Sequence, residues 1–266
     1  MGAFADLGGN ILANFLFALG FGGFSYAVVR VADRGFLDFF GVRESRTMVV
    51  YLSNLWDRSK GPPKSPIVSG HEFRVARSAG GLFDNASLRL PDVVKALVDT
   101  ATAGRRVALS VEISPNDREG IVFSNMIVVG STTKNSVRQH YFARGLPWLT
   151  LCGEAAEPSP DIHESPIKPR VHVTQGPDAG HVIDQDYNYG TVEKLRDPEH
   201  NDCTVFLCAG MRGDSSWAAT EYLVRHWRKL AWKYGNKPFA LCLGFPRSEE
   251  YMETYVEPAL VAGYSA

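Results

Sequence analysis

Two segments of the chain combine glycine with small polar residues in a pattern that suits anion binding. They are "VVGSTTKNSV" (128–137) and "CAGMRGDSSW" (208–217), and each follows an apolar run and leads into a helical pattern. Free N–H groups and the helix dipole at such a place attract anions. Lys134 and Arg212 can add charge-assisted hydrogen bonds to phosphate. The predicted ligand contacts are Gly130, Ser131, Asn135, Gly210, Arg212, Gly213, Asp214 and Ser215, with Asn54 at the end of a third strand.

A purely structural interpretation of these segments stays open. Strand-to-helix turns need glycine, and Ser, Asp and Asn are preferred helix N-caps, so Asp214 or Ser215 can simply cap a helix. Neither segment matches GxxxxGK[ST] or GxGxxG. The ligand hypothesis is favoured because both segments are expected on the same edge of one sheet.

Two carboxylates are candidates for acid–base chemistry. Glu112 interrupts the apolar stretch "LSVEISP", where a buried carboxylate needs a partner. Asp186 lies two residues from Asp184 in "VIDQDYNYG", so the pair shares one face of a strand. Either could serve as a general acid or base or stabilise an oxocarbenium-like centre. The alternatives are an outward-facing Glu112 and a solvated hairpin at Asp186. No CxxC or HxxxH spacing occurs, so no metal site is predicted, and the cofactor is left open.

The elements that must position these residues alternate between apolar strands and helices. Strands are expected over 47–55, 106–113, 125–131, 201–210 and 237–245, and helices over 90–104 and 216–234. Continuous apolar strands indicate a sheet covered on both faces. The pattern therefore predicts a layered α/β fold with a mostly parallel sheet and helices on both faces. Ligands bind outside the carboxyl ends of the strands in such folds.

The N-terminus carries the clearest signal in the chain. Residues 7–29 contain no charge, and roughly 20 apolar residues suffice to cross a bilayer. We therefore expect a transmembrane helix (1–31), a juxtamembrane segment (32–46) and a cytosolic domain (47–266). The arginines that follow the span place the N-terminus outside and the domain in the cytoplasm, at the inner membrane of a bacterium. Phe36, Phe39 and Phe40 are expected at the membrane interface. Glycines within the span would permit a homo-oligomer.

Composition narrows the set of partners. The 266 residues carry a net charge of −1, which gives no electrostatic support for nucleic acid as a partner. The cysteines Cys152, Cys203, Cys208 and Cys242 lie mostly in apolar runs and are expected to be reduced.

Several stretches together resemble a known group of proteins. They are "FFGV", "NMIVVGSTTKNSV", "DYNYGTVEKL" and "AGMRGDSSWAATEYLVRHW". The chain resembles a widespread set of bacterial proteins that have one N-terminal membrane helix and a cytosolic α/β domain. The resemblance covers most of the chain and implies no particular activity. More distantly, the layered pattern is similar to nucleoside deoxyribosyltransferase-like, SLOG and TIR domains, which bind or cleave nucleotides, often in antiviral systems. No residue here can be assigned to the catalytic glutamate of NAD-cleaving TIR enzymes.

Three functions are consistent with the sequence. The leading hypothesis is a membrane-anchored sensor or effector that binds a nucleotide-like small molecule, in signalling or defence. The first alternative is an N-glycoside hydrolase or transferase acting on nucleosides or NAD, with Glu112 or Asp186 as its carboxylate. The second is a protein-interaction module that has no small-molecule ligand.

Overall fold

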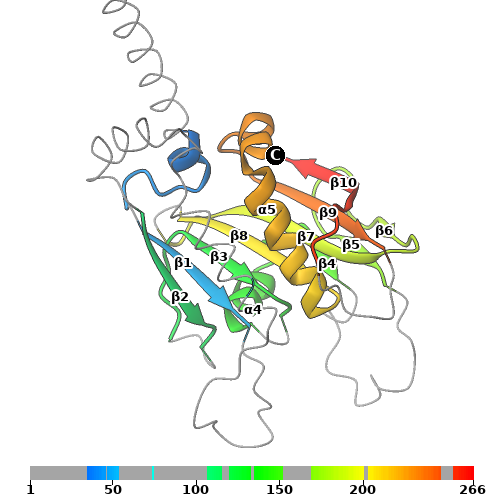
Figure 1. The fold of residues 1–266 in the computed structure, drawn as a ribbon, viewed down its shortest axis with the longest axis horizontal. Helices are drawn as coiled ribbons and strands as arrows, with labels where there is room; N and C mark the ends of the chain where they lie inside the picture. The colour runs from blue at the N-terminus through cyan, green and yellow to red at the C-terminus, as the bar shows by residue number, and fades with distance from the viewer. Residues whose placement is uncertain are drawn as a thin grey trace, which may run out of the picture.

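The computed structural model describes residues 35–45, 47–53, 74, 107–115, 120–132, 135–151, 169–200, 203–246 and 254–266 (Figure 1). In these residues a seven-stranded sheet has the order β10-β9-β7-β8-β3-β1-β2. Its strands are β1 (Thr47–Leu52), β2 (Ala108–Ile113), β3 (Met126–Val129), β7 (Asn188–Asp197), β8 (Cys203–Gly210), β9 (Phe239–Phe245) and β10 (Ala259–Ser265). A second sheet contains β4 (Leu149–Leu151), β5 (Val171–Val173) and β6 (Val182–Ile183). The helices are α4 (Ser136–Ala143) and α5 (Gly213–Tyr234).

The large sheet is mixed, so the prediction of a mostly parallel sheet is wrong. β1 pairs in parallel with β2 and β3, and β3 pairs in parallel with β8. By contrast, β7 is antiparallel to both β8 and β9, and β10 is antiparallel to β9. The short connection 198–202 between β7 and β8 explains part of this error, because a parallel pair needs a crossover of about a dozen residues or more.

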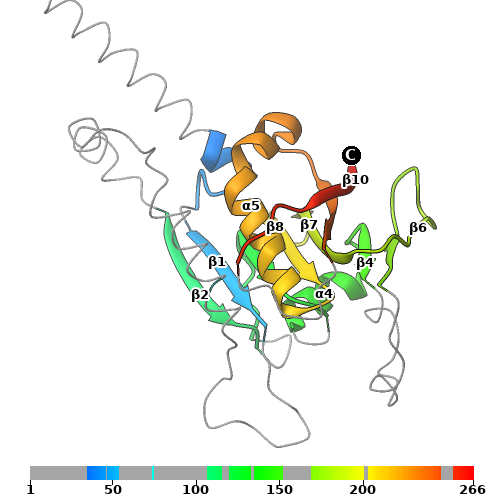
Figure 2. The ribbon, with the colours of Figure 1, turned by 45° about the vertical axis from the view of Figure 1, so that its right-hand side comes forward.

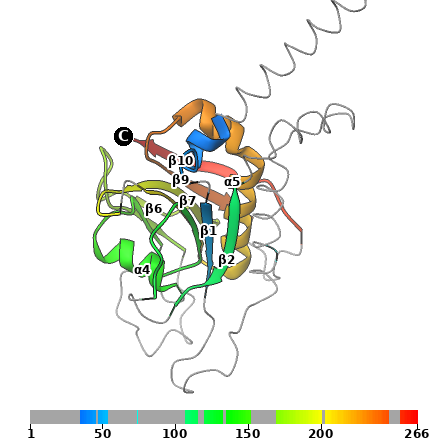
Figure 3. The same cartoon turned by 90° about the vertical axis from the view of Figure 1, so that its left-hand side faces the viewer.

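Helices lie on both faces of the sheet, but the second face is not covered by helix alone. One face of the sheet is covered by α5, which crosses from β8 to β9, and by a helical segment at residues 35–39 (Figure 2). The other face is covered by α4 and by the antiparallel sheet β4-β5-β6 (Figure 3). A small antiparallel sheet, which was not predicted from the sequence, thus shares the second layer with α4. The hairpin considered at Asp186 does not form, because the flanking strands β6 and β7 belong to different sheets.

The phenylalanines expected at a membrane interface lie in the core instead. Phe36, Phe39 and Phe40 are each at most 3% exposed and pack against α5 and the sheet. The Phe36 ring meets Trp227 edge-on, with 5.0 Å between centroids. These rings fix residues 35–40 beside the C-terminal half of α5, as Figures 1, 2 and 3 agree.

No helix within the described ranges is long and apolar enough to cross a membrane. The predicted span at residues 7–29 and the predicted helix at 90–104 both lie outside those ranges. The cysteines Cys203, Cys208 and Cys242 are free thiols, and burial raises the pKa of Cys208 and of Cys242 to about 12.

The central strand β7 is buried on both faces although it carries charges. Lys194 is fully buried, and its Nζ donates to the carbonyl of Gly235 just after α5, at 2.9 Å. The same ammonium lies 4.5 Å from the Phe39 ring centroid. Burial, followed by the nearby Arg196, lowers the pKa of Lys194 to about 7. Lys194 therefore joins the sheet, the end of α5 and residues 35–40.

This lowered pKa predicts that the protein becomes more stable as pH rises. Between pH 7 and about 10.5 the unfolded chain holds a proton on this lysine that the folded protein has lost. The free energy of unfolding should therefore increase across this window, with a slope of up to ~1.4 kcal/mol per pH unit from this group. Urea titrations should show a shallower pH dependence for Lys194→Met. Exposed Lys229→Met is the control, and an identical pH profile for wild type and Lys194→Met would contradict the assignment.

Candidate functional site

The two predicted glycine segments lie side by side at the carboxyl ends of β3 and β8. These strands are neighbours in register, with Val129 opposite Cys208. The N–H of Gly130 extends the ladder by donating to the Cys208 carbonyl at 2.9 Å. From this point α4 packs onto one face of the sheet and α5 onto the other. Adjacent parallel strands whose helices leave on opposite faces form a topological switch point, where α/β proteins place ligands.

Asn135 connects three elements at this edge. Its Oδ1 caps α4 by accepting from the N–H groups of Val137 and Arg138 at 3.0 and 3.2 Å. Its Nδ2 donates to the carbonyl of Val129 at 2.8 Å and to that of Tyr51 at 3.4 Å. Because these bonds use both ends of a side chain that is 1% exposed, Asn135 holds β1, β3 and α4 together.

Serine side chains make further hydrogen bonds at this edge of the sheet, and two of these serines were not predicted as site residues. The Oγ of Ser53 donates to the Val129 carbonyl at 3.0 Å. Gly130 has φ +104°, and a Cβ there would lie 1.8 Å from that Oγ, so the position requires glycine. Beside β2, Ser114 Oγ accepts from the N–H of Ser136 at 2.9 Å. A sequence signal was present, since Ser53 lies near the end of the strand predicted over 47–55 and Ser114 directly follows the one predicted over 106–113. Ser131 is half-buried at the same edge.

The start of α5 is pressed against the end of β8. A Cβ on Gly210 would lie 2.4 Å from Ser215 Oγ and 2.5 Å from the backbone N of Ser216. Opposite it in register, a Cβ on Gly190 would lie 2.9 Å from the Phe245 ring. The glycine pair lets the first turn of α5 approach the sheet, which accounts for Gly210 by packing alone.

Within that first turn the polar groups bond to one another. The Oγ of Ser215 accepts from the N–H of Arg212 and can return a bond to its carbonyl, each at 3.0 Å. Asp214, 1% exposed, accepts from the N–H of Ser215 at 2.7 Å. The Arg212 guanidinium lies 3.6 Å from the Asp214 carboxylate. Helix capping therefore occupies much of this turn, while Gly213 remains exposed at its tip.

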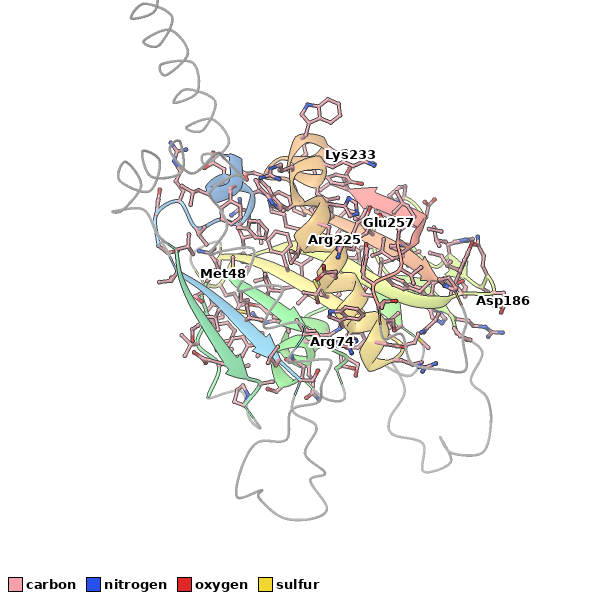
Figure 4. The ribbon with its side chains drawn as sticks, viewed as in Figure 1. Met48, Arg74, Asp186, Arg225, Lys233 and Glu257 are labelled. Atoms are coloured by element: carbon pink, nitrogen blue, oxygen red, sulfur yellow. The ribbon has the colours of Figure 1, made fainter. Side chains whose placement is uncertain are left out.

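Two arginines and one indole surround this end of α5. The Arg74 guanidinium lies 5.2 Å from the centroid of the Trp217 ring (Figure 4). The Arg212 side chain is 30% exposed. The Trp217 ring is 7% exposed, and within the described ranges its Nε1–H has no hydrogen-bond partner. Among the described residues, Arg74 and Arg212 add positive charge near this helix terminus, in the same sense as the dipole of α5, and Asp214 offsets part of it.

The predicted carboxylates do not join these loops. Glu112 lies on β2, the edge strand, where it is half-exposed, faces Tyr51 in register and accepts from Ser110 Oγ at 2.8 Å. Asp186 is exposed in the turn between β6 and β7, far from Arg74 in Figure 4. Asn54 lies outside the described residues. In the part of the chain that the structure describes, no group of three or more metal-ligating side chains occurs.

A buried ion pair joins α4 to the main sheet. Arg138 on α4 and Glu193 on β7 are both fully buried, with 3.8 Å between Nη2 and Oε1. Glu193 Oε2 also accepts from the N–H groups of Trp148 and Leu149, at 2.6 and 3.2 Å. This carboxylate thus joins α4, the second sheet and the main sheet. Neither residue was predicted from the sequence.

A second polar cluster lies at the opposite edge of the sheet. Asp197 accepts from Tyr141 Oη and from His200 Nδ1, each at 2.8 Å, and the His200 ring stacks on Phe123 at 3.6 Å. Burial, then the bond to Asp197, raises the pKa of Tyr141. These contacts tie α4 to the β7–β8 turn, on the edge away from both glycine segments.

A scan against protein-family models, a search of curated proteins and a search of solved structures each found no match to this chain. The geometry of the site is therefore the basis for a functional proposal.

The close approach of α5 makes Gly210 a sensitive position. Gly210→Ala should lower the free energy of unfolding by about 1–3 kcal/mol, because the new methyl meets backbone atoms rather than a movable side chain. Gly35→Ala is a matched control, since a Cβ there meets nothing within 4 Å. Chemical denaturation compares them, and equal stability of the two variants would contradict the packing argument.

Loss of one partner of the buried ion pair should be more costly. Glu193→Leu leaves the Arg138 charge buried without its carboxylate and should destabilise by about 3–5 kcal/mol. The exposed pair Arg43–Asp38, at 3.4 Å, provides the comparison, and Arg43→Ala should cost ~1 kcal/mol or less. Similar losses in both variants would show that Glu193 is not a structural centre. The double variant Arg138→Met/Glu193→Leu should recover part of the loss.

Proposed function

We propose that this protein is a membrane-anchored sensor or effector that binds a nucleotide-like, phosphate-bearing small molecule on the cytoplasmic side of the inner membrane. The ligand occupies the edge between the β3–α4 and β8–α5 loops. Binding rather than bond cleavage is the function that the arrangement of the described residues favours.

One observation carries this proposal: the neighbouring strands β3 and β8 send their helices to opposite faces at the two glycine segments. Such a switch point is where open α/β sheets place nucleotides. The helix terminus at Gly213 supplies N–H groups that have no partner within the helix, which suits a phosphate oxygen.

Electrostatics support an anion at this position. Arg212 and Arg74 stand at the positive end of α5, and a guanidinium can hold two phosphate oxygens at once. Asp214 offsets part of this charge, so the recognition falls on the arginines and the backbone. Most predicted side-chain contacts, Asn135 and Ser215 among them, are used to shape the loops.

The two alternative functions have less support. A glycoside hydrolase needs a carboxylate at the bound sugar, and Glu112 and Asp186 both lie away from the loops. An interaction module would use exposed side chains of α5; Trp217 and Trp227 pack into the core at 7% and 8% exposure, and Trp232 alone of the three helix tryptophans is exposed, at 90%.

Thermal shift tests the proposal with NAD, ADP, a cyclic dinucleotide, inorganic phosphate and adenosine as probes. At least one phosphorylated probe should raise the melting temperature while adenosine does not, because a ligand at a hundredfold its Kd stabilises by about 2.7 kcal/mol. In Arg212→Gln the affinity for that probe should fall by about 10–100-fold, the range expected for losing a charged hydrogen bond.

Arg225→Gln is the matched control, an exposed arginine further along the same helix. Its affinity should equal that of wild type. A chain that responds to none of the probes, or an Arg212→Gln variant that binds as well as wild type, would refute this site.

A further inference from the structure

One apolar side chain near the end of α5 is turned outward. Trp232 is 90% exposed, whereas its neighbours Leu230 and Tyr234 lie in the core. Leaving an indole in water gives up the favourable burial of a large ring. Tryptophan is enriched where one part of its environment is apolar and another is wet, above all at membrane–water interfaces.

The surface around Trp232 is cationic. Exposed basic side chains on or just after this half of the helix are Arg225, Arg228, Lys229, Lys233 and Lys237. The sequence 222–248 contains no Asp or Glu. Arg225 bonds Glu221 at 2.7 Å. Among the described residues, no carboxylate forms a salt bridge with Lys229, Lys233 or Lys237. The helix dipole attracts cations only within the last turn, so it does not account for the whole set.

This surface lies close to the chain that leads from the predicted membrane span. Phe36 packs on Trp227, five residues before Trp232 on the same helix. Residue 29, the end of that span, is seven residues before Phe36. An extended chain covers at most about 3.6 Å per residue, so the span ends within about 25 Å of Phe36, whatever path it takes. Lys233 stands at the end of α5 opposite Arg74 (Figure 4).

We infer that the C-terminal half of α5 is a docking surface for an anionic lipid bilayer. Trp232 inserts among the headgroups, and Lys229, Lys233 and Lys237 contact acidic lipids. This inference rests on the proposed anchor for its geometry, but it concerns a different surface from the ligand site. It orients the domain with the α5 N-terminus, and therefore the ligand site, facing the cytoplasm.

The charge distribution favours a lipid surface over the other partners. The whole chain has a net charge of −1, so the basic residues at this end are balanced by acidic residues elsewhere. A local basic surface with one exposed indole fits the negative cytoplasmic leaflet, which attracts basic segments next to a membrane span. A second copy of the chain is the competing occupant and is an outcome of the test.

The full chain in nanodiscs tests the inference through the fluorescence of Trp232, taken as the wild-type spectrum minus that of Trp232→Phe. With anionic lipids whose acyl chains carry bromine, this difference emission should fall roughly twofold relative to unbrominated anionic discs, because the indole reaches the headgroup–acyl boundary. Lys229→Glu/Lys233→Glu and high salt should each restore it. Val182→Trp, at an exposed position of β6, should not be quenched in the Trp232→Phe background.

Equal emission from brominated and unbrominated discs would overturn the inference. A second outcome would also overturn it: in lipid-free micelles, Trp232 becomes protected from iodide quenching as protein concentration rises. That result would identify a second copy of the chain as the occupant. If alkaline carbonate extracts the chain from membranes, the anchor is wrong. The binding of the same variants to anionic vesicles is then compared by co-sedimentation. Binding that does not depend on Trp232 and Lys233 would refute the proposed docking surface on α5. Nucleotide affinity, measured separately with Arg212→Gln, reports on the ligand site alone.

Discussion

The fold depends on burying a strand that carries adjacent charges pointing to opposite faces. On β7, Glu193 faces α4 and the small sheet while Lys194 faces α5 and residues 35–40. A buried charge is tolerated only with partners, so each face must supply them. Arg138 and two backbone amides serve Glu193, and the Gly235 carbonyl with the Phe39 ring serves Lys194. These polar contacts fix the positions of the three layers relative to one another. Hydrophobic packing alone is less directional and would not determine those positions.

The helix α5 connects the two functional proposals. Its first turn is held against the sheet by Gly190 and Gly210, and its last turns pack on Phe36 and end at the carbonyl that Lys194 binds. A helix fixed at both ends behaves as a rigid strut of about 33 Å, given 22 residues at 1.5 Å each. Its electropositive N-terminus and its basic, Trp-bearing C-terminus are therefore kept at opposite ends of the domain.

Elements were predicted correctly where the local residue pattern matches the place of the segment in the folded protein. The strands near 47–52, 126–129 and 203–210 were located because they are continuous apolar runs, and α5 because its apolar residues keep a helical period. Strand β10 was missed, although its residues 259–265 are mostly apolar; it forms the edge of the sheet, antiparallel to β9, and is mostly exposed. The direction of β7 could have been deduced from the short connection 198–202. The burial of Glu193 and Lys194 could not have been deduced from the sequence. Charged residues in a strand usually indicate exposure to solvent, and these two are buried only because other layers cover both faces of β7.

The candidate site shows the same division between position and role. The order of strands and helices was enough to predict both glycine segments at one edge of the sheet. In the structure, the parallel pairing of β3 with β8 puts them there. What the side chains do at that edge depends on distances that sequence does not contain. Asn135 and Ser215 are suited to phosphate by type, yet the structure uses them to join strand ends and to cap helices. Small polar residues in such loops shape the backbone first. The proposed recognition of an anion would then use the N–H groups at the exposed Gly213 together with the nearby guanidinium groups of Arg212 and Arg74.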